Sequence, residues 1–246
     1  MGKRKPYWVF YDFKKAHAAL LFVRSIGHAK KAIKKFNPDI VVGFGGYPSA
    51  SAVQAAFGLK IKTMIHEQNS IIGLTNKILI KKVDQIVCCY QKAYQEFPKE
   101  KTLLLGNPRA SVIVHEQPKD VYDEYHLDRQ KKVVTIVMGS LGSQTVNQTM
   151  KECMDQFKGK DYQVVYVSGK PYYESMKAYE NENVHIVPYV NDMPSLMHIT
   201  DLIVSRAGAS TLAELTALGV PAILIPSPYV SANHQEYNAR ELVNNQ

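Results

Sequence analysis

The sequence predicts an α/β protein of two doubly wound domains, each built on a parallel sheet. Short apolar runs alternate with helical stretches along most of the 246 residues. The runs, such as 39–44, are continuous and rich in β-branched residues, which is typical of strands buried on both faces of a parallel sheet. One strand–turn–helix–strand unit occurs twice, and chains of this length often divide into two domains. We therefore expect two similar sheet domains.

The apolar runs mark the expected strands of each domain. The first domain has runs at 39–44, 63–66, 85–89 and 102–105, and the second at 133–138, 163–168, 185–187, 202–205 and 222–225. Helical stretches lie between them, for example at 143–157 and 211–218. Prolines and charged residues interrupt the pattern over 107–119, which indicates a domain boundary there. We therefore expect domains at 1–110 and 111–246.

The repeated unit places glycine turns and polar residues at one edge of each sheet. Asp39 begins a strand that leads to Gly45 and Gly46, and Asp201 begins one that leads to Gly208. Ligands of open α/β sheets bind beyond the carboxyl ends of the strands. The candidate binding loops therefore start at residues 45, 66, 139, 190, 206 and 226.

Positive charge is concentrated at the start of the chain. The net charge is +8, yet residues 1–38 hold ten Lys and Arg against one acid, Asp12. The basic residues are Lys3, Arg4, Lys5, Lys14, Lys15, Arg24, Lys30, Lys31, Lys34 and Lys35. Interspersed aromatic and aliphatic residues suit docking on an anionic membrane surface. An ordinary helix with a solvated basic face fits the pattern equally well. Binding to nucleic acid is disfavoured, because the segment contains no motif of a known DNA- or RNA-binding module.

Neither a membrane span nor a disulfide or metal framework is indicated. No stretch approaches the ~20 consecutive apolar residues of a spanning helix. The first residues also lack the apolar core of a secretory signal. Cys88, Cys89 and Cys153 show neither disulfide-framework nor metal-ligand spacing, so a reducing cytoplasm is the simplest interpretation.

A glycine turn after the first strand of the second domain is a candidate phosphate site. The run 133–138 leads into Gly-Ser-Leu-Gly at 139–142 and then a helix, whose free N–H groups and positive end suit a phosphate. Ser140 adds a hydroxyl donor. Glycines also serve tight turns alone, so this signal leaves both interpretations open. The turn is not G-x-G-x-x-G, and no acid at dinucleotide spacing supports NAD.

The segment 205–214 is a second candidate site. Arg206 precedes small residues that let a diphosphate approach the backbone, and Ser210 or Thr211 is the expected helix cap. Glu214 lies about one turn inside the helix, where its carboxylate suits both hydroxyls of a ribose. A cap followed by a solvated glutamate is the alternative interpretation.

Polar residues also cluster at the edge of the first sheet. His66-Glu67-Gln68-Asn69 ends a buried strand, which favours ligand binding over a satisfied histidine with local caps. A metal is not indicated, because no second His or Cys lies at helical spacing. The flexible turn of Gly45, Gly46 and Tyr47 is expected at the same edge. Arg109 follows the first domain, and Gln235 lies at the start of the last helix.

Together these segments closely resemble the MurG family of N-acetylglucosaminyltransferases of bacterial cell-wall synthesis. The matching stretches, in family order, are GFGGYPS (43–49), HEQNSIIGLTNK (66–77), GNPR (106–109), MGSLGSQTVN (138–147), PYVNDM (188–193), SRAGASTLAE (205–214) and HQEYNA (234–239). The HEQN stretch is the most specific of them. The resemblance implies the GT-B arrangement, with two Rossmann-like domains, a cleft between them, and an incomplete first domain in this chain.

The resemblance also implies roles for particular residues. The donor UDP-N-acetylglucosamine would be held by Asn69, Arg109, Ser140, Val190, Arg206, Ala209, Ser210, Thr211, Glu214 and Gln235. The undecaprenyl-linked acceptor would face Gly45, Gly46, Tyr47, His66 and Glu67. Within the donor set, Val190 would meet the uracil, Glu214 the ribose, and Asn69 and Gln235 the sugar. The implied reaction is inverting transfer at the cytoplasmic face of the cell membrane, with no cofactor and no metal.

This sequence departs from the family pattern at both ends. The family's opening Gly-rich loop, GGTGGH-like, supplies the suspected general base and has no counterpart here, so no catalytic residue is assigned. We expect a chain truncated at both ends, with domain 1–110 on the acceptor and membrane side and domain 111–246 binding the UDP-sugar. Little or no transfer is expected from such a chain. The alternatives are a non-catalytic UDP-sugar-binding remnant and a related glycolipid transferase, which the HEQN stretch disfavours.

Overall fold

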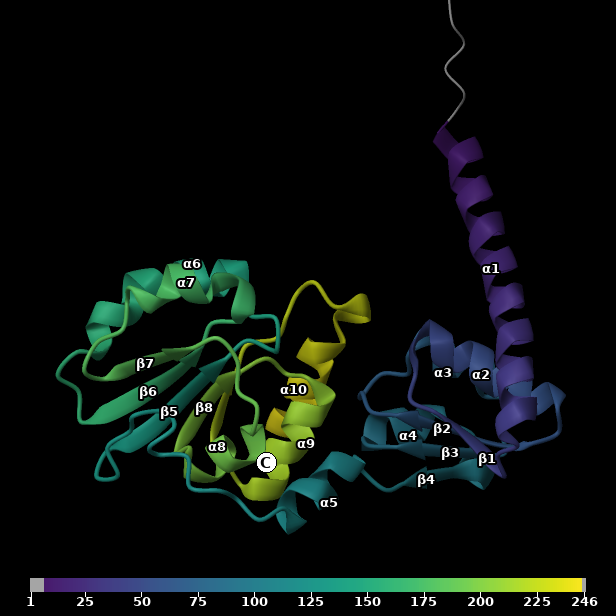
Figure 1. Ribbon diagram of the computed structural model, residues 1–246. Helices are drawn as coiled ribbons and strands as arrows, with labels where there is room; N and C mark the ends of the chain where they lie inside the picture. Colours follow the sequence, from purple (N-terminus) through teal and green to yellow (C-terminus); the bar gives the residue numbers. More distant parts are fainter. Residues whose placement is uncertain (1–6, 245–246) are drawn as a thin grey trace, which may run out of the picture. The chain divides into compact units, whose positions relative to one another are not determined.

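The computed structural model describes residues 7–244, with side chains for His17 and from Leu20 onward (Figure 1). These residues form two compact units that divide after Gly106. The expected boundary at residue 110 falls inside α5 (Pro108–His115), which belongs to the second unit. Of the basic residues noted above, Lys3, Arg4 and Lys5 lie outside the described residues, as do the side chains of Lys14 and Lys15.

The first unit is a four-stranded parallel sheet in the order β1-β2-β3-β4. Its elements are α1 (Tyr7–Phe36), β1 (Ile40–Gly43), α2 (Gly46–Gly58), β2 (Lys62–Glu67), α3 (Leu74–Leu79), β3 (Gln85–Cys88), α4 (Gln91–Glu96), a 3-10 turn (Lys99–Lys101) and β4 (Thr102–Leu104). The core joins Val53 of α2, Ile65 of β2 and Ile86 of β3, none of which is exposed. All four strands lie within the apolar runs expected for them, except that β2 extends one residue further at each end.

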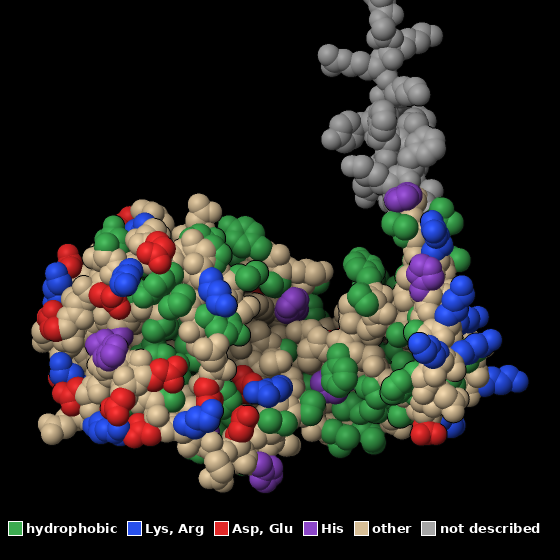
Figure 2. Space-filling model, viewed as in Figure 1, with side chains coloured by type: hydrophobic (Ala, Val, Ile, Leu, Met, Phe, Trp, Pro, Cys, Tyr) green, Lys and Arg blue, Asp and Glu red, His purple; other side chains and the backbone are tan. Residues whose placement is uncertain are grey.

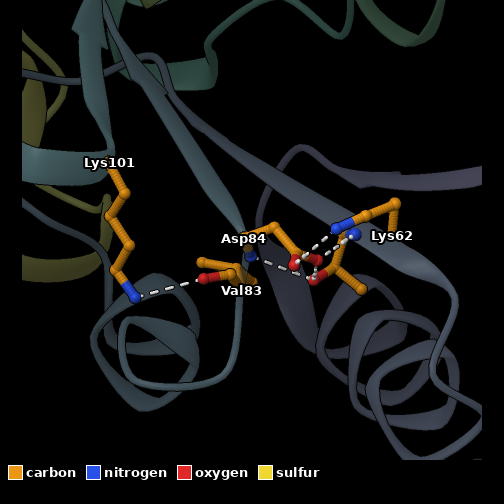
Figure 3. A network of polar contacts seen from close by, with 5 residues as sticks. Lys62, Val83, Asp84 and Lys101 are labelled. Carbon is orange, nitrogen blue, oxygen red and sulfur yellow. Dashed lines mark hydrogen bonds and ion pairs between the residues drawn. The ribbon is translucent and has the colours of Figure 1, made fainter.

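Asp84 organises the amino end of this sheet (Figure 3). Its carboxylate accepts hydrogen bonds from the backbone N–H and the hydroxyl of Thr63, at 2.8 and 3.0 Å, and pairs with Lys62. The bonds from Thr63 hold the pKa of Asp84 below its usual value. Lys101 donates to the carbonyl of Val83 next to it. These contacts fix strand register at the edge away from the polar loops.

The second unit is a five-stranded parallel sheet in the order β7-β6-β5-β8-β9. After α5 come β5 (Lys132–Val137), α6 (Gln144–Cys153), a 3-10 turn (Met154–Phe157), β6 (Tyr162–Val167), a 3-10 turn (Lys170–Tyr172), α7 (Tyr173–Lys177), β7 (Val184–Val187), α8 (Met193–Ile199), β8 (Leu202–Ser205), α9 (Ala209–Leu218), β9 (Ala222–Leu224), a 3-10 turn (Ser231–Asn233) and α10 (His234–Asn244).

Both faces of the second sheet are covered, which explains its continuous apolar strands. Along β5, Val133 and Val137 enter a cluster with residues of α5, α8 and α9, while Ile136 faces a cluster with residues of α6 and α7. Figure 1 shows α6 and α7 on one side of this sheet and α8 and α9 on the other. The parallel-sheet α/β architecture expected for both domains is confirmed.

One local expectation is wrong. The sequence favours Ser210 or Thr211 as the cap of the helix in the segment 205–214, but α9 begins at Ala209, so both residues lie inside it. Gly208 occupies the capping position and offers no side-chain hydrogen bond. Three residues thus separate the strand from the helix, and the N–H groups of its first turn have no side-chain cap.

The two units differ in surface charge. Figure 2 shows Lys and Arg side chains gathered along α1, whereas acidic and basic side chains are mixed over the second unit. Arg24, Lys31, Lys34 and Lys35 of α1 are exposed or partly exposed. Apolar side chains share the same helix, and Leu20, Leu21 and Val23 are about half exposed or more, at 57%, 49% and 63%. None of the described helices is long and apolar enough to cross a membrane.

Candidate functional site

A cavity of about 660 Å³ lies at the carboxyl ends of the strands of the second unit. The last residues of β5, β6 and β8, which are Val137, Val167 and Ser205, form part of its wall. It also brings together six of the residues expected to bind the donor, from loops far apart in the sequence. These are Ser140, Val190, Arg206, Thr211, Glu214 and Gln235.

The loop after β5 is shaped by an approach between two backbones. Gly142 has φ +71°, and a Cβ on it would lie 2.1 Å from the carbonyl oxygen of Ser168. Gly169 faces it, and a Cβ there would lie 2.5 Å from the carbonyl oxygen of Leu141. Both positions therefore require glycine. Sequence reasoning identified Gly142 but missed Gly169, because its role depends on a loop distant in the chain.

The start of α9 supplies unpaired N–H groups at the cavity. Thr211 lines the cavity, while Ala209 and Ser210, the first residues of the helix, are not part of its wall. The positive end of a helix with no side-chain cap is a favourable place for a phosphate.

Arg206 forms part of the cavity wall and joins three loops. Its guanidinium donates to the carbonyl oxygens of Ile225 and Pro226, at 3.1 and 3.3 Å, and to the Ser143 hydroxyl at 3.2 Å. These contacts tie the end of β9 to the start of α6. They also hold a positive charge between the two candidate phosphate loops.

Glu214 lines the cavity and forms a salt bridge with Arg109 of α5. The Nε and Nη2 atoms of Arg109 lie 2.7 and 2.6 Å from the same carboxylate oxygen, Oε1. The side chain of Glu214 is 12% exposed, so the alternative of a solvated glutamate does not hold. Arg109 is absent from the cavity wall.

The far side of the cavity is closed by the segment that leads into α10. The side-chain oxygen of Gln235 accepts a hydrogen bond from the backbone N–H of Ser227 at 2.8 Å, which orients its amide. Tyr189 and Tyr229 also line the cavity. Neither was identified from the sequence, although Tyr189 directly precedes Val190 in a strand-end loop, and that position was the available signal.

In the first unit, Glu67 is a buried organiser of the HEQN loop. It is 1% exposed, and Oε1 accepts from the backbone and side-chain nitrogens of Asn69 at 3.0 and 3.2 Å. Oε2 accepts from the N–H of Gly73 and from the side chain of Asn76, both at 2.8 Å. Glu67 therefore shapes the loop, and its carboxylate is fully used within it. Asn69 belongs to this unit and not to the wall of the cavity described above.

His66 is buried next to the glycine turn. Its Nε2 lies 3.2 Å from the carbonyl oxygen of Gly106, its ring is 5.2 Å from that of Phe44, and its Nδ1 has no partner among the described residues. Cys89 lies 3.6 Å from Nε2, and burial raises the pKa of this thiol to about 12. The thiol is therefore protonated and unreactive at neutral pH.

The glycine turn leads into α2 beside an apolar cavity. Gly45 and Gly46 have φ +85° and +77°, and α2 starts at Gly46 with no side-chain cap. Tyr47 is 77% exposed. A cavity of about 790 Å³ adjoins this end of α2 and is almost entirely apolar. Its wall includes Leu21, Phe22, Pro48, Ala50, Leu74 and Ile78.

The described residues contain no group of three or more His, Cys, Asp or Glu side chains that could hold a metal ion. The charged groups at the cavity of the second unit are Arg206 and Glu214. Its chemistry is thus that of uncapped helix N–H groups, one guanidinium and one carboxylate. This combination suits a ligand that carries both phosphates and hydroxyls.

Two domains of one known protein family match most of the chain. Residues 9–88 match the Glycosyltransferase family 28 N-terminal domain, and residues 133–246 match the Glycosyltransferase family 28 C-terminal domain. The UDP-N-acetylglucosamine--N-acetylmuramyl-(pentapeptide) pyrophosphoryl-undecaprenol N-acetylglucosamine transferase of Bacillus cytotoxicus is 43% identical over 94% of the chain. A Bacillus cereus relative, numbered 1 under the same name, is 44% identical over 90%.

These relatives are longer than the chain, which spans 65% and 62% of their respective lengths. Among solved structures, MurG of Acinetobacter baumannii superposes with a TM-score of 0.71 at 28% identity. That match covers 92% of this chain and 63% of the Acinetobacter protein. The architecture is therefore shared over nearly the whole chain.

Proposed function

We propose, from the premise that the chain belongs to glycosyltransferase family 28, that its protein transfers N-acetylglucosamine from UDP-N-acetylglucosamine to an undecaprenyl-diphospho-N-acetylmuramoyl-pentapeptide. The relatives' names describe this transfer. The observation that carries the proposal is the cavity of the second unit, where a glycine loop, an uncapped helix start and a carboxylate meet. Each of these features suits one part of a nucleoside diphosphate.

The donor's diphosphate is proposed to lie between the loop at 139–142 and the start of α9. Backbone N–H groups at both places, the hydroxyls of Ser140 and Thr211, and the cation of Arg206 favour negative charge there. Val190 would meet the uracil through its backbone, and Glu214 the ribose. Gln235 would bind the N-acetylglucosamine.

The transfer inverts the configuration of the sugar. A hydroxyl of the acceptor attacks the anomeric carbon from the face opposite UDP, and the bond from that carbon to the diphosphate oxygen breaks. The proton of the attacking hydroxyl passes to a general base, to which we assign no residue of this chain. The leaving UDP gains negative charge at the diphosphate, where Arg206 and the positive end of α9 stabilise it.

The acceptor is proposed to bind at the first unit. The turn of Gly45, Gly46 and Tyr47, with His66 beneath it, would face the polar part of the acceptor, while Glu67 holds the HEQN loop in shape. The apolar cavity that adjoins this turn would take the nearest isoprene units of the lipid. The exposed basic and apolar residues of α1 support docking on the anionic cytoplasmic face of the membrane (Figure 2).

Calorimetric titration of the purified chain with UDP-N-acetylglucosamine tests the donor site. We expect binding in wild type and at least a tenfold loss in Glu214→Ala, because hydrogen bonds to a charged group contribute about 1.5–3 kcal/mol each. Glu174→Ala, which removes an exposed carboxylate from α7, is the control and should bind as wild type does. No binding by a folded wild-type chain, or equal binding by Glu214→Ala, would contradict the assigned site.

A transfer assay with the lipid-linked acceptor then separates an enzyme from a binding remnant. Turnover by the same preparation supports the transferase. Donor binding without turnover supports a non-catalytic UDP-sugar-binding role for this chain. Transfer to a different glycolipid in preference to the muramoyl acceptor would favour the related-transferase alternative.

A further inference from the structure

The segment between β9 and α10 carries an aromatic side chain at the mouth of the cavity of the second unit. Tyr229 is part of the cavity wall, yet it is 84% exposed. Its backbone N–H donates to the hydroxyl of Ser227 at 3.4 Å. Within the part of the chain whose side chains are described, the hydroxyl of Tyr229 has no hydrogen-bond partner. The ring therefore lies beside the cavity without being fixed there.

The base of this segment is firmly held, whereas its tip is not. The backbone N–H of Ile225 donates to the carbonyl oxygen of Ser205 at 2.8 Å, and Arg206 donates to the carbonyl oxygen of Ile225. At the other end, the backbone N–H of Ser227 donates to the side chain of Gln235 on the first turn of α10. The residues between these contacts, 228–233, are exposed or partly exposed. In Figure 1 the segment is the yellow loop above α10.

The tip ends in a backbone conformation that side chains disfavour. Ala232 and Asn233 have φ +54° and +52°. Asparagine is tolerated in this left-handed region better than most residues, but the Cβ of an alanine comes too close to a backbone carbonyl oxygen. Strained backbone of this kind is concentrated at ligand clamps and switch regions. The strain at Ala232 favours a second arrangement of the tip, in which its φ is negative.

We propose that residues 227–233 form a lid over the donor site. When UDP-N-acetylglucosamine binds, Ala232 turns to negative φ and the ring of Tyr229 moves over the sugar. This inference rests on the proposed function, in which Gln235, at the base of the lid, binds that sugar. Closure relieves the strain at Ala232 and buries the exposed ring against the ligand. UDP alone offers no sugar for the ring to cover, so it leaves the lid as it is.

The affinities of UDP-N-acetylglucosamine and of UDP test the role of the ring. Both are measured by calorimetry for wild type and Tyr229→Ala, which should fold because the side chain is exposed. We expect the affinity for UDP-N-acetylglucosamine to fall about tenfold, because the apolar area buried on closure is lost, and that for UDP to stay unchanged. Tyr179→Ala removes another exposed tyrosine of the second unit, outside the cavity wall, and should change neither affinity.

The hinge is tested by a substitution that removes the strain. Glycine adopts positive φ without cost, so Ala232→Gly should favour the arrangement without ligand. We expect the affinity for UDP-N-acetylglucosamine to fall about three- to fivefold, with that for UDP unchanged. His126→Gly is the matched control, because His126 also has φ +54° in the second unit but does not line the cavity. It should change neither affinity.

Closure itself is tested by limited proteolysis with chymotrypsin, followed by mass spectrometry. Cleavage after Tyr229 should be at least about tenfold slower when UDP-N-acetylglucosamine saturates the chain, and unchanged when UDP does. Equal cleavage with and without the sugar nucleotide, equal protection by UDP, or equal weakening of both ligands in Tyr229→Ala would each overturn the lid and leave the donor site standing. If folded wild type binds neither ligand, the proposed function fails and the lid fails with it.

Discussion

Each unit carries a glutamate near the carboxyl edge of its sheet, and the two side chains differ in their hydrogen bonding. Glu67 of the first unit is 1% exposed, and both of its oxygens accept hydrogen bonds from its own loop. Glu214 of the second unit is held through one oxygen and lines a cavity. The first carboxylate builds the loop, and the second is available to a ligand.

The difference comes from the connection after each strand. After β2 the chain makes a long loop before α3, and that loop folds back so that Gly73 and Asn76 donate to Glu67. Only three residues separate β8 from the helix α9, and Glu214 lies on the second turn of this helix, where it pairs with Arg109 of α5 and not with its own loop. A polar residue at a sheet edge is therefore structural or ligand-facing according to the length and path of the next connection.

The largest effect is expected at Glu67. Glu67→Ala leaves its loop donors without an acceptor in a buried place, so the free energy of unfolding of the first unit should fall by about 3 kcal/mol or more. Hydrogen exchange of residues 62–88 at increasing denaturant concentration measures this loss. Glu96→Ala, an exposed acid of α4, should change nothing. A Glu67→Ala protein as stable as wild type would mean that the loop is not held by this carboxylate.

A smaller effect, confined to the second unit, is expected at Gly142. Gly142→Ala places a Cβ 2.1 Å from the Ser168 carbonyl oxygen, so the loop at 139–142 must move, and UDP affinity should fall about tenfold or more. Gly159→Ala is the matched control, because Gly159 also has positive φ, +65°, but open space around it. It should cost only about 1 kcal/mol of stability and leave the affinity unchanged. Equal affinities in the two variants would contradict the role given to the loop.

The buried thiols predict a pH dependence for the first unit. Burial raises the pKa of Cys88 to about 11 and that of Cys89 to about 12, whereas unfolded thiols titrate near ~8.5. The unfolded chain therefore releases its thiol protons first, and stability falls as pH rises from ~8.5 toward 11. Denaturant midpoints between pH 7 and 10 should fall less steeply in Cys89→Ala than in wild type. Identical slopes would show that the thiols do not contribute.

The smallest effect concerns the apolar cavity of the first unit. Ile78→Ser should weaken binding of farnesyl diphosphate about fivefold, since part of an isoleucine side chain is removed from an apolar contact. Phe36→Ser removes an apolar residue that is 82% exposed and outside the cavity, and it serves as control. Inorganic diphosphate should bind both variants alike. If Ile78→Ser binds farnesyl diphosphate as wild type does, the lipid lies elsewhere.

The sheets could be predicted from the sequence because their strands are buried on both faces. A run such as 133–138 is mostly apolar because Val133 and Ile136 enter clusters on opposite faces of the sheet, and its one polar residue, Thr135, is buried and pairs with Thr200. The polar loops could be placed for a related reason, since parallel strands end at one edge.

The contacts within the sites could not be predicted. The pair of Arg109 and Glu214 joins positions 105 residues apart, and the approach of Gly142 to Gly169 depends on how two loops pack. The position of Glu67 in the sequence does not predict whether its side chain turns into its own loop or toward solvent. The start of α9 was misjudged because Ser210 and Thr211 are good capping residues, whereas the small residues before them allow an earlier start.

Hydrogen exchange with and without UDP-N-acetylglucosamine tests most directly the claim that the second unit holds the donor. Both units are followed in one experiment on the same chain. We predict slower exchange at the backbone N–H groups of 139–145 and 206–211 when the ligand is bound, with no comparable change at 62–67 in β2. Protection confined to the first unit, or none in the second unit at a ligand concentration that saturates binding, would contradict this claim.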